Sequence, residues 1–198
     1  RYGEDLYGRL ALPELLQQLC RIPSIKWVRI LYCYPDRITD QLLEVMAQEE
    51  KIVKYMDIPL QHADGALLAQ MNRRGNRESL TSLLNRIREK VPGVILRTTM
   101  IVGFPGETQE QLEELCQFVK DVKFERLGCF TYSAEEDTPA AEMPNQVDEE
   151  LKRHRAELLM DTQYPILEAF NQSQVGQTLE VAVEGFEDGY WYGRSYMD

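Results

Sequence analysis

Apolar residues along this chain occur in two alternating patterns. Short, nearly continuous apolar runs predict strands covered on both faces, and apolar residues spaced three and four apart predict amphipathic helices. The predicted strands are residues 27–34, 53–60, 95–104 and 126–133. The predicted helices are residues 13–21, 65–72, 77–90 and 147–172, with two more that begin after Thr39 and Thr108. Strands separated by helices indicate an α/β fold with a parallel sheet and right-handed crossovers.

The pattern changes near Val175. Residues 178–186 and 190–196 alternate with a period of two, and Asp188-Gly189 between them predicts a hairpin turn. We therefore expect one domain over residues 1–175 and the start of a β domain over 176–198. Pro165 lies within the last predicted helix, so we expect a kink or break there.

Composition narrows the class of protein. The net charge of −11 disfavours nucleic acid as a partner; it would attract a basic protein or serve solubility alone. No apolar run is long enough to span a membrane. The four cysteines have no metal-type spacing, and we expect reduced thiols in a cytoplasmic protein. The chain starts at Arg1 and stops within a strand-like pattern, so we expect a piece of a longer polypeptide.

Four stretches follow the predicted strands. In parallel α/β folds, function gathers at the carboxyl ends of the strands, which meet at one edge. The stretches are residues 34–36, 59–62, 103–108 and 132–137. The last contains an acidic loop, residues 135–137, that could grip a basic substrate or simply face solvent.

The stretch after the third strand is the most informative. Its glycines, Gly103 and Gly106, would let the backbone approach a ligand, and the turn leads to a helix N-terminus that favours anions. Thr108 and Gln111 have the spacing of a capping box for that helix. A plain strand-to-helix connection would also explain the glycines.

Three polar residues nearby are further candidates. Gln61 could hydrogen-bond a ribose or a carboxylate, and His62 could be structural or line the pocket. Arg97 lies inside the third strand and needs a partner if its face is enclosed. That partner is either the carboxylate of a ligand or a carboxylate of a neighbouring strand, such as Asp57.

Several motifs in order resemble one known family, the methylthiotransferases of the radical S-adenosylmethionine superfamily. They are Arg-Tyr-Gly-Glu-Asp-Leu-Tyr-Gly at 1–8, Tyr-Cys-Tyr-Pro-Asp-Arg-Ile at 32–38, Asp-Ile-Pro-Leu-Gln-His at 57–62, Met-Asn-Arg-Arg-Gly at 71–75 and Ile-Val-Gly-Phe-Pro-Gly-Glu-Thr at 101–108. The first and third look like the branch that modifies a ribosomal protein rather than the tRNA branch.

The resemblance implies a fold and a reaction. The fold would be a partial (β/α) barrel of the radical SAM type, with this chain holding strands three to six, followed by the first strands of a TRAM-like β-barrel. The reaction would add a methylthio group to an aspartate β-carbon of small-subunit ribosomal protein twelve. A 5′-deoxyadenosyl radical from one S-adenosylmethionine would abstract hydrogen, and a second S-adenosylmethionine would supply the methyl group.

The resemblance also implies cofactors and site residues. S-adenosylmethionine and two [4Fe–4S] clusters would serve the whole protein, but the C-x3-C-x2-C motif for the radical cluster is not in this chain. We therefore expect the chain alone to be inactive. The whole protein would be a monomer that binds its ribosomal protein substrate and could contact the ribosome. The residues expected to line the S-adenosylmethionine pocket are Gln61, His62, Arg97, Gly103, Phe104, Pro105, Gly106, Glu107 and Tyr132.

Three other functions remain open from the sequence. The first is a tRNA methylthiotransferase, which the acidic charge disfavours. The second is a cluster-free (β/α) barrel hydrolase or aldolase that uses His62 and Glu107 as acid and base. The third is a non-catalytic binding module with the same fold.

Overall fold

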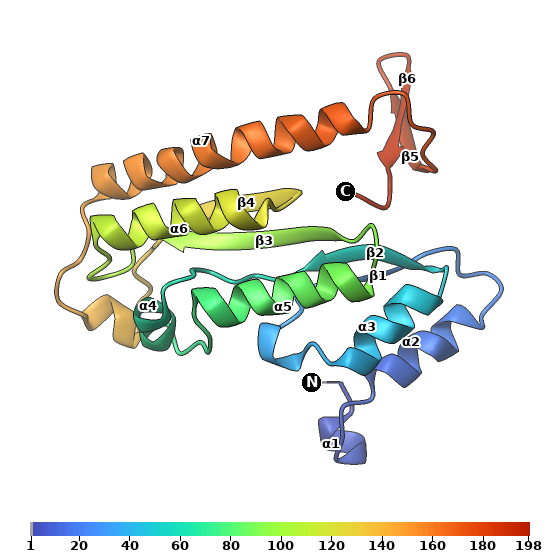
Figure 1. The fold of residues 1–198 in the computed structure, drawn as a ribbon, viewed down its shortest axis with the longest axis horizontal. Helices are drawn as coiled ribbons and strands as arrows, with labels where there is room; N and C mark the ends of the chain where they lie inside the picture. The colour runs from blue at the N-terminus through green and yellow to red at the C-terminus, as the bar shows by residue number, and fades with distance from the viewer. Residues whose placement is uncertain (1) are drawn as a thin grey trace.

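A four-stranded parallel sheet forms the centre of the computed structural model, which describes residues 2–198. The strands lie in the order β1-β2-β3-β4, and they form the parallel sheet that the alternation of strands and helices predicted (Figure 1). They are β1 Val28–Ile30, β2 Ile52–Asp57, β3 Ile95–Val102 and β4 Arg126–Thr131. Each pair of neighbours is parallel, so the fold class inferred from the sequence is confirmed.

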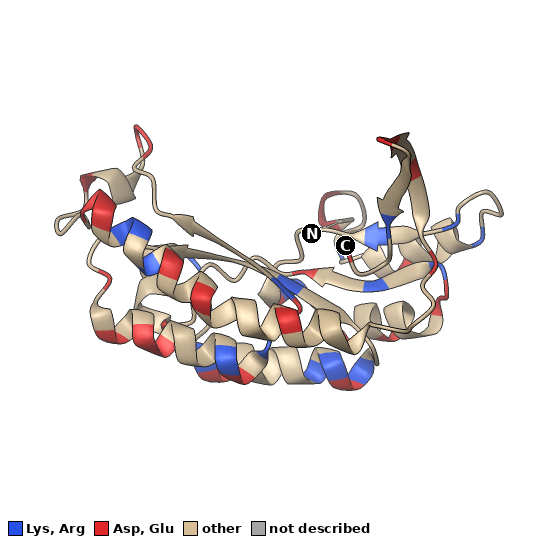
Figure 2. Ribbon diagram, turned by 90° about the horizontal axis from the view of Figure 1, so that it is seen from above, with Lys and Arg blue, Asp and Glu red and all other residues tan. Residues whose placement is uncertain are grey.

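The helices lie to one side of the sheet, and no helix covers the opposite face in the described residues (Figure 2). In β3, every second side chain from Leu96 to Val102 is buried beneath the helices, whereas Arg97, Thr99 and Ile101 on the open face stay partly exposed. The helices are α1 Glu4–Tyr7, α2 Leu12–Cys20, α3 Asp40–Gln48, α4 Gly65–Gln70, α5 Arg77–Lys90, α6 Gln109–Val122 and α7 Glu149–Ser173, with 3-10 turns at Pro35–Arg37 and Pro139–Glu142.

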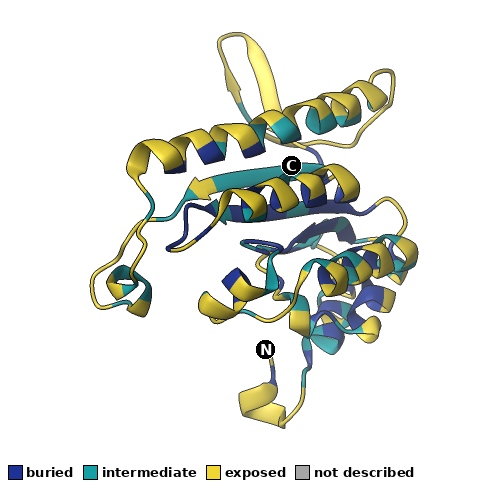
Figure 3. Cartoon of the chain, turned by 60° about the vertical axis from the view of Figure 1, so that its left-hand side comes forward, coloured by how far each residue is buried: buried dark blue, intermediate teal, exposed yellow. Residues whose placement is uncertain are grey.

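Local signals set the helix starts as expected. The Thr39 hydroxyl accepts a hydrogen bond from Leu42 N at 3.2 Å, and Thr108 forms a reciprocal capping box with Gln111. The apolar stripe of α6 is buried, as Figure 3 shows for the sheet-facing side of the helices. The Thr108 cap matters for function because α6 begins directly after residues 103–107, which we call the glycine turn.

The first strand is shorter than the sequence predicted. A strand was expected over residues 27–34, but β1 ends at Ile30. Tyr32 has a φ of 57°, in the left-handed region, which ends the extended backbone that a strand needs. The residues after β1 therefore form a loop rather than a longer sheet edge.

The break expected at Pro165 is wrong, because α7 is assigned as one helix of 25 residues. Proline removes the hydrogen bond to the carbonyl four residues earlier, which belongs to Asp161. Both Asp161 and Pro165 are exposed, so water can satisfy that carbonyl and the helix continues. α7 therefore runs unbroken along α6 and β4 toward the C-terminal hairpin (Figure 1).

We expect Pro165→Ala to raise the free energy of unfolding by about 1 to 3 kcal/mol, because alanine restores the missing N–H without removing a buried contact. Urea denaturation of the full-length protein would measure the change. Glu168→Ala, at another exposed position of α7, is the matched control and should change stability little. A destabilised P165A would show that the proline sets a bend that the fold needs.

The predicted hairpin is present. β5 Ala182–Glu187 pairs antiparallel with β6 Tyr190–Arg194, and Asp188 and Gly189 both have positive φ, at 50° and 84°. Two successive positive φ angles are those of a type I′ turn. Beyond the hairpin, the last residues return to the open face of the sheet, where Arg126 Nη2 lies 3.0 Å from Asp198 Oδ1. Met197 packs there against Val53 and Tyr55 of β2.

None of the helices between residues 2 and 198 is both long and apolar enough to cross a membrane. All four cysteines are free thiols. Burial raises the pKa of Cys33 to about 11 and that of Cys129 to about 12, so neither is a ready nucleophile.

Candidate functional site

The carboxyl ends of β2, β3 and β4 meet at one edge of the sheet. Gln61 N donates to Thr99 O at 2.9 Å, and Gln61 O accepts from Ile101 N at 2.7 Å. On the other side of β3, Tyr132 N donates to Val102 O at 2.8 Å. Gln61 and Tyr132 therefore flank the strand that leads into the glycine turn.

The two glycines of the turn serve different purposes. Gly103 has a φ of +74°, and a Cβ there would overlap the side chain of Lys152 from α7. Gly106 has a φ of +81°, and a Cβ there would meet nothing within 4 Å. The close approach at Gly103 is therefore made by the protein itself, and the open space lies beside Gly106.

Glu107 closes the turn on itself and joins it to α7. Its Oε2 accepts a hydrogen bond from Gly103 N at 2.9 Å. Arg155 of α7 donates from Nη1 to Glu107 Oε1 at 2.9 Å and to the Glu107 carbonyl at 3.0 Å. Burial raises the pKa of Glu107, and the neighbouring Arg155 guanidinium opposes that rise. The carboxylate thus closes the turn and ties it to α7.

His62 lies behind the same carboxylate and is fully buried. Its Nδ1 accepts from Asp64 N at 2.9 Å, so a neutral ring carries its proton on Nε2. Nε2 lies 3.9 Å from Glu107 Oε2 and has no hydrogen-bond partner among the described residues. Neither side chain is exposed, which argues against the alternative in which His62 and Glu107 act on a substrate as acid and base.

The burial of His62 predicts a pH dependence of stability. Desolvation lowers its pKa from 6.5 to about 4. The unfolded chain takes up a proton below pH 6.5 and the folded chain does not, so the free energy of unfolding should fall by about 3 kcal/mol between pH 6.5 and 4.

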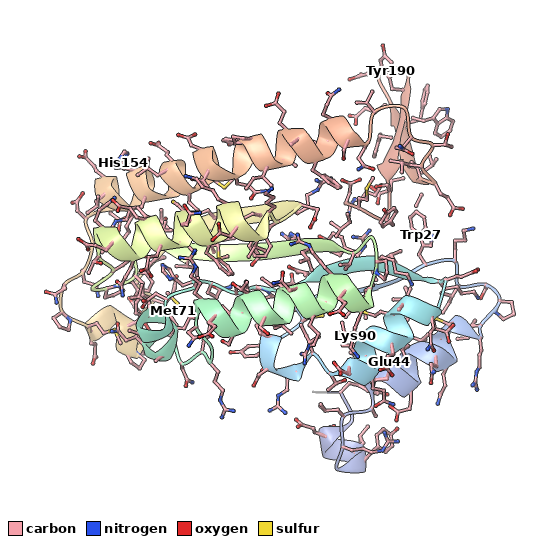
Figure 4. The ribbon with its side chains drawn as sticks, in the orientation of Figure 1. Trp27, Glu44, Met71, Lys90, His154 and Tyr190 are labelled. Atoms are coloured by element: carbon pink, nitrogen blue, oxygen red, sulfur yellow. The ribbon has the colours of Figure 1, made fainter. Side chains whose placement is uncertain are left out.

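This dependence can be assigned to one histidine. His62→Asn keeps an acceptor for Asp64 N and should flatten the pH profile of urea denaturation. His154, on α7 (Figure 4), is the matched control, because it is exposed and H154N should leave the slope unchanged. Equal slopes for wild type and H62N would contradict the assignment.

Two aromatic residues, Phe104 and Tyr132, pack together beside the glycine turn. The rings of Phe104 and Tyr132 meet edge to face with centroids 5.2 Å apart, and Lys152 Nζ lies 5.2 Å from the Tyr132 ring. Pro105 beside them is buried. The Tyr132 hydroxyl is buried and has no hydrogen-bond partner in the described chain, so its donor is unused in this structure.

Arg97 lies apart from this group, on the open face of the sheet. Its Nη1 is 3.2 Å from Asp57 Oδ2, which is the neighbouring-strand partner considered from the sequence. The Arg97 side chain is 42% exposed and the Asp57 side chain only 2%. Arg97 comes five residues before the end of β3, so only a ligand that extends down the open face would reach it.

A cavity of about 680 Å³ opens at the same edge, beside the end of β1. Tyr34 and Asp36, from a strand-end stretch that the sequence singled out, are among its lining residues. None of the nine predicted site residues lines it. The strand ends therefore share an edge, but this cavity lies beside the end of β1 rather than at the glycine turn.

Sequence reasoning missed Lys152 and Arg155. Both lie on a helix rich in charged residues, where lysine and arginine are ordinarily solvated. Their side chains are 4% and 6% exposed. The one available signal was their spacing of three, which puts both on the face of α7 that also carries Leu159.

The described residues do not fit a [4Fe–4S] cluster. They contain no group of three His, Cys, Asp or Glu side chains that could hold a metal ion. Two features of the glycine turn suit the chemistry of S-adenosylmethionine: open space beside Gly106 and the Gln61 side chain at the adjoining strand end.

Two curated proteins are similar to this chain in sequence over its whole length. It is 50% identical over 198 residues to ribosomal protein uS12 methylthiotransferase RimO of Caldanaerobacter subterraneus subsp. tengcongensis. It is also 50% identical over 199 residues to the RimO of Lachnoclostridium phytofermentans. Both alignments cover 100% of this chain and 45% of the relative, so the chain spans about half the length of the curated relatives it matches.

A solved structure and a family model agree on the fold. Coproporphyrinogen III oxidase (HemN) from Escherichia coli, a radical SAM enzyme, superposes with a TM-score of 0.51 at 19% identity, covering 74% of this chain and 32% of that one. The model of the Radical SAM superfamily matches residues 3–119, which include β1, β2, β3 and the glycine turn. The chain therefore belongs to the radical SAM superfamily.

Proposed function

We propose that the full-length protein is a radical SAM methylthiotransferase that modifies ribosomal protein uS12. The observation that carries the proposal is the identity of 43–50% with eight curated relatives, all named RimO, over nearly the whole of this chain. Because the chain spans about half of those relatives, the activity belongs to the full-length protein.

The edge formed by β2, β3 and β4 is the proposed S-adenosylmethionine site. The turn from Gly103 to Glu107 has open space beside the Gly106 Cα, whereas Gly106 N donates to Asn145 O at 2.9 Å, and the N-terminus of α6 follows. Gln61 offers an amide from the neighbouring strand end, and Tyr132 offers its hydroxyl. His62 supports the site through its position behind Glu107 rather than by reaching the ligand. Arg97 would meet only the part of the ligand that extends down the open face.

Bound S-adenosylmethionine supplies the radical and the methyl group that the reaction needs. This chain contributes the surface that binds and orients it. Since the described residues hold no set of cluster ligands, we expect the chain alone to bind S-adenosylmethionine weakly and to cleave none.

The substrate proposal extends to an aspartate β-carbon of uS12. The chain carries a net charge of −11, and its acidic loop, residues 135–137, is exposed. A ribosomal protein is basic, so its charge complements this surface, whereas tRNA would be repelled. We place the protein in the cytoplasm, as a monomer that can contact the ribosome.

We further propose that residues 176–198 begin a TRAM-like β domain used in substrate recognition. The hairpin of β5 and β6 carries exposed Tyr190, Trp191 and Tyr192, and Figure 4 shows Tyr190 at its outer end. Large exposed aromatic side chains are typical of recognition surfaces.

The test is a reaction with the full-length protein, reconstituted anaerobically with iron and sulfide and supplied with a reductant, a sulfur source, S-adenosylmethionine and uS12. Mass spectrometry should find one methylthio group on an aspartate of uS12, and this chain alone should give none. Cleavage of S-adenosylmethionine with modification of tRNA instead of uS12 would overturn the substrate, and no cleavage would overturn the enzyme class.

A further inference from the structure

The glycine turn is held from outside by α7. Arg155 makes two hydrogen bonds to Glu107, one to its carboxylate at 2.9 Å and one to its carbonyl at 3.0 Å. The other oxygen of that carboxylate accepts from Gly103 N at 2.9 Å. A chain of hydrogen bonds therefore runs from α7 through Glu107 to the first residue of the turn.

A second contact from α7 reaches the same place. The Lys152 stem fills the space where Gly103 lacks a Cβ, and Lys152 Nζ lies 5.2 Å from the Tyr132 ring. Lys152 and Arg155 are one turn of helix apart, so the same segment of α7 touches both the turn and the tyrosine beside it.

We propose that Arg155 is a positioning residue for S-adenosylmethionine: it acts through Glu107 to fix the turn from Gly103 to Glu107 in its binding shape. This inference rests on the proposed function. It makes the helix that leads to the C-terminal hairpin part of the cofactor site, although α7 lies outside residues 3–119, which match the superfamily.

The geometry separates this role from simple stability. Gln163, eight residues further along α7, is also buried and donates from Nε2 to Phe124 O at 2.8 Å. Phe124 precedes β4, so Gln163 joins α7 to the opposite end of the sheet from the turn. Both residues join α7 to the rest of the fold, but only Arg155 contacts the proposed site.

The experiment uses the full-length protein, reconstituted anaerobically, with four forms: wild type, Arg155→Lys, Arg155→Met and Gln163→Met. The dissociation constant of S-adenosylmethionine is measured by equilibrium dialysis, and the KM and kcat of its reductive cleavage by release of 5′-deoxyadenosine. Thermal unfolding reports the stability of each form.

We expect R155M to weaken S-adenosylmethionine binding by about tenfold or more, mainly in KM, because the turn loses its outer support. R155K keeps one donor and should recover part of the affinity. Q163M should lower the melting temperature and leave the dissociation constant within about twofold of wild type.

The outcomes separate this inference from the proposed function. A wild-type protein that neither binds nor cleaves S-adenosylmethionine contradicts the proposed function. A wild-type protein that binds it, with R155M and R155K unchanged in affinity, contradicts the positioning role. Equal weakening by Q163M and the Arg155 variants would show a general effect of stability and would also overturn it. If R155M does not fold, the dissociation constants of R155K and Q163M are compared: weaker binding by R155K alone supports the positioning role, and equal binding contradicts it.

Discussion

Replacing Gly103 by alanine is expected to destabilise the protein by about 2 to 5 kcal/mol. The φ of +74° costs a non-glycine residue about 1 to 2 kcal/mol, and a Cβ that overlaps the Lys152 side chain adds about 1 to 3 kcal/mol. Urea denaturation of the full-length protein and its G103A variant measures the loss.

Gly106→Ala is the matched control within the same turn. Its φ of +81° carries a similar backbone cost, but its Cβ would meet open space. G106A should therefore lose only about 1 to 2 kcal/mol of stability and instead weaken S-adenosylmethionine binding, because the new methyl group occupies the space proposed for the ligand.

A second-site change tests the cause of the G103A defect. Lys152→Ala removes the atoms of the stem beyond Cβ and should restore part of the stability of G103A, since only the Lys152 Cβ, at 3.1 Å, would remain close. Equal stability losses for G103A and G106A, without any recovery in G103A/K152A, would contradict packing of α7 against Gly103.

Local rules account for the parts of this fold that a sequence can predict. Thr39 and Thr108 cap helices because their hydroxyls satisfy free N–H groups within three residues. Asp188 and Gly189 fix the hairpin because both accept positive φ. The strands run parallel because a helix lies between each strand and the next. Parallel strands have their carboxyl ends at one edge, which brings Gln61, the glycine turn and Tyr132 together there.

Features that depend on contacts between distant segments, or on a single backbone angle, could not be predicted from the sequence. Arg97 had two possible partners, and only the register of β2 and β3 puts Asp57 opposite it. Tyr32 shortened β1 through a backbone angle that no apolar pattern reports. Lys152 and Arg155 look like surface residues until α7 is docked on the glycine turn, because burial of a charge depends on a partner far away in the sequence.

The Glu107 carboxylate gives the second large prediction. Glu107→Gln should cost about 3 to 5 kcal/mol, because it leaves the Arg155 guanidinium buried without a counter-charge. The Gln side chain can still accept from Gly103 N, so the loss reports the missing charge rather than an open turn. Chemical denaturation of the full-length protein provides the measurement.

Removing both charges separates stability from cofactor binding. Glu107→Gln combined with Arg155→Met no longer buries an unpaired charge, and should regain most of the stability lost in E107Q. It also lacks the link from α7 to the turn, so its affinity for S-adenosylmethionine should stay as low as that of R155M. If the double variant recovers affinity together with stability, the turn keeps its binding shape without the link to α7, and the positioning role of Arg155 is contradicted. If it recovers neither, the ion pair is not the reason that E107Q is unstable, and the proximity of Glu107 to His62 becomes the stronger explanation.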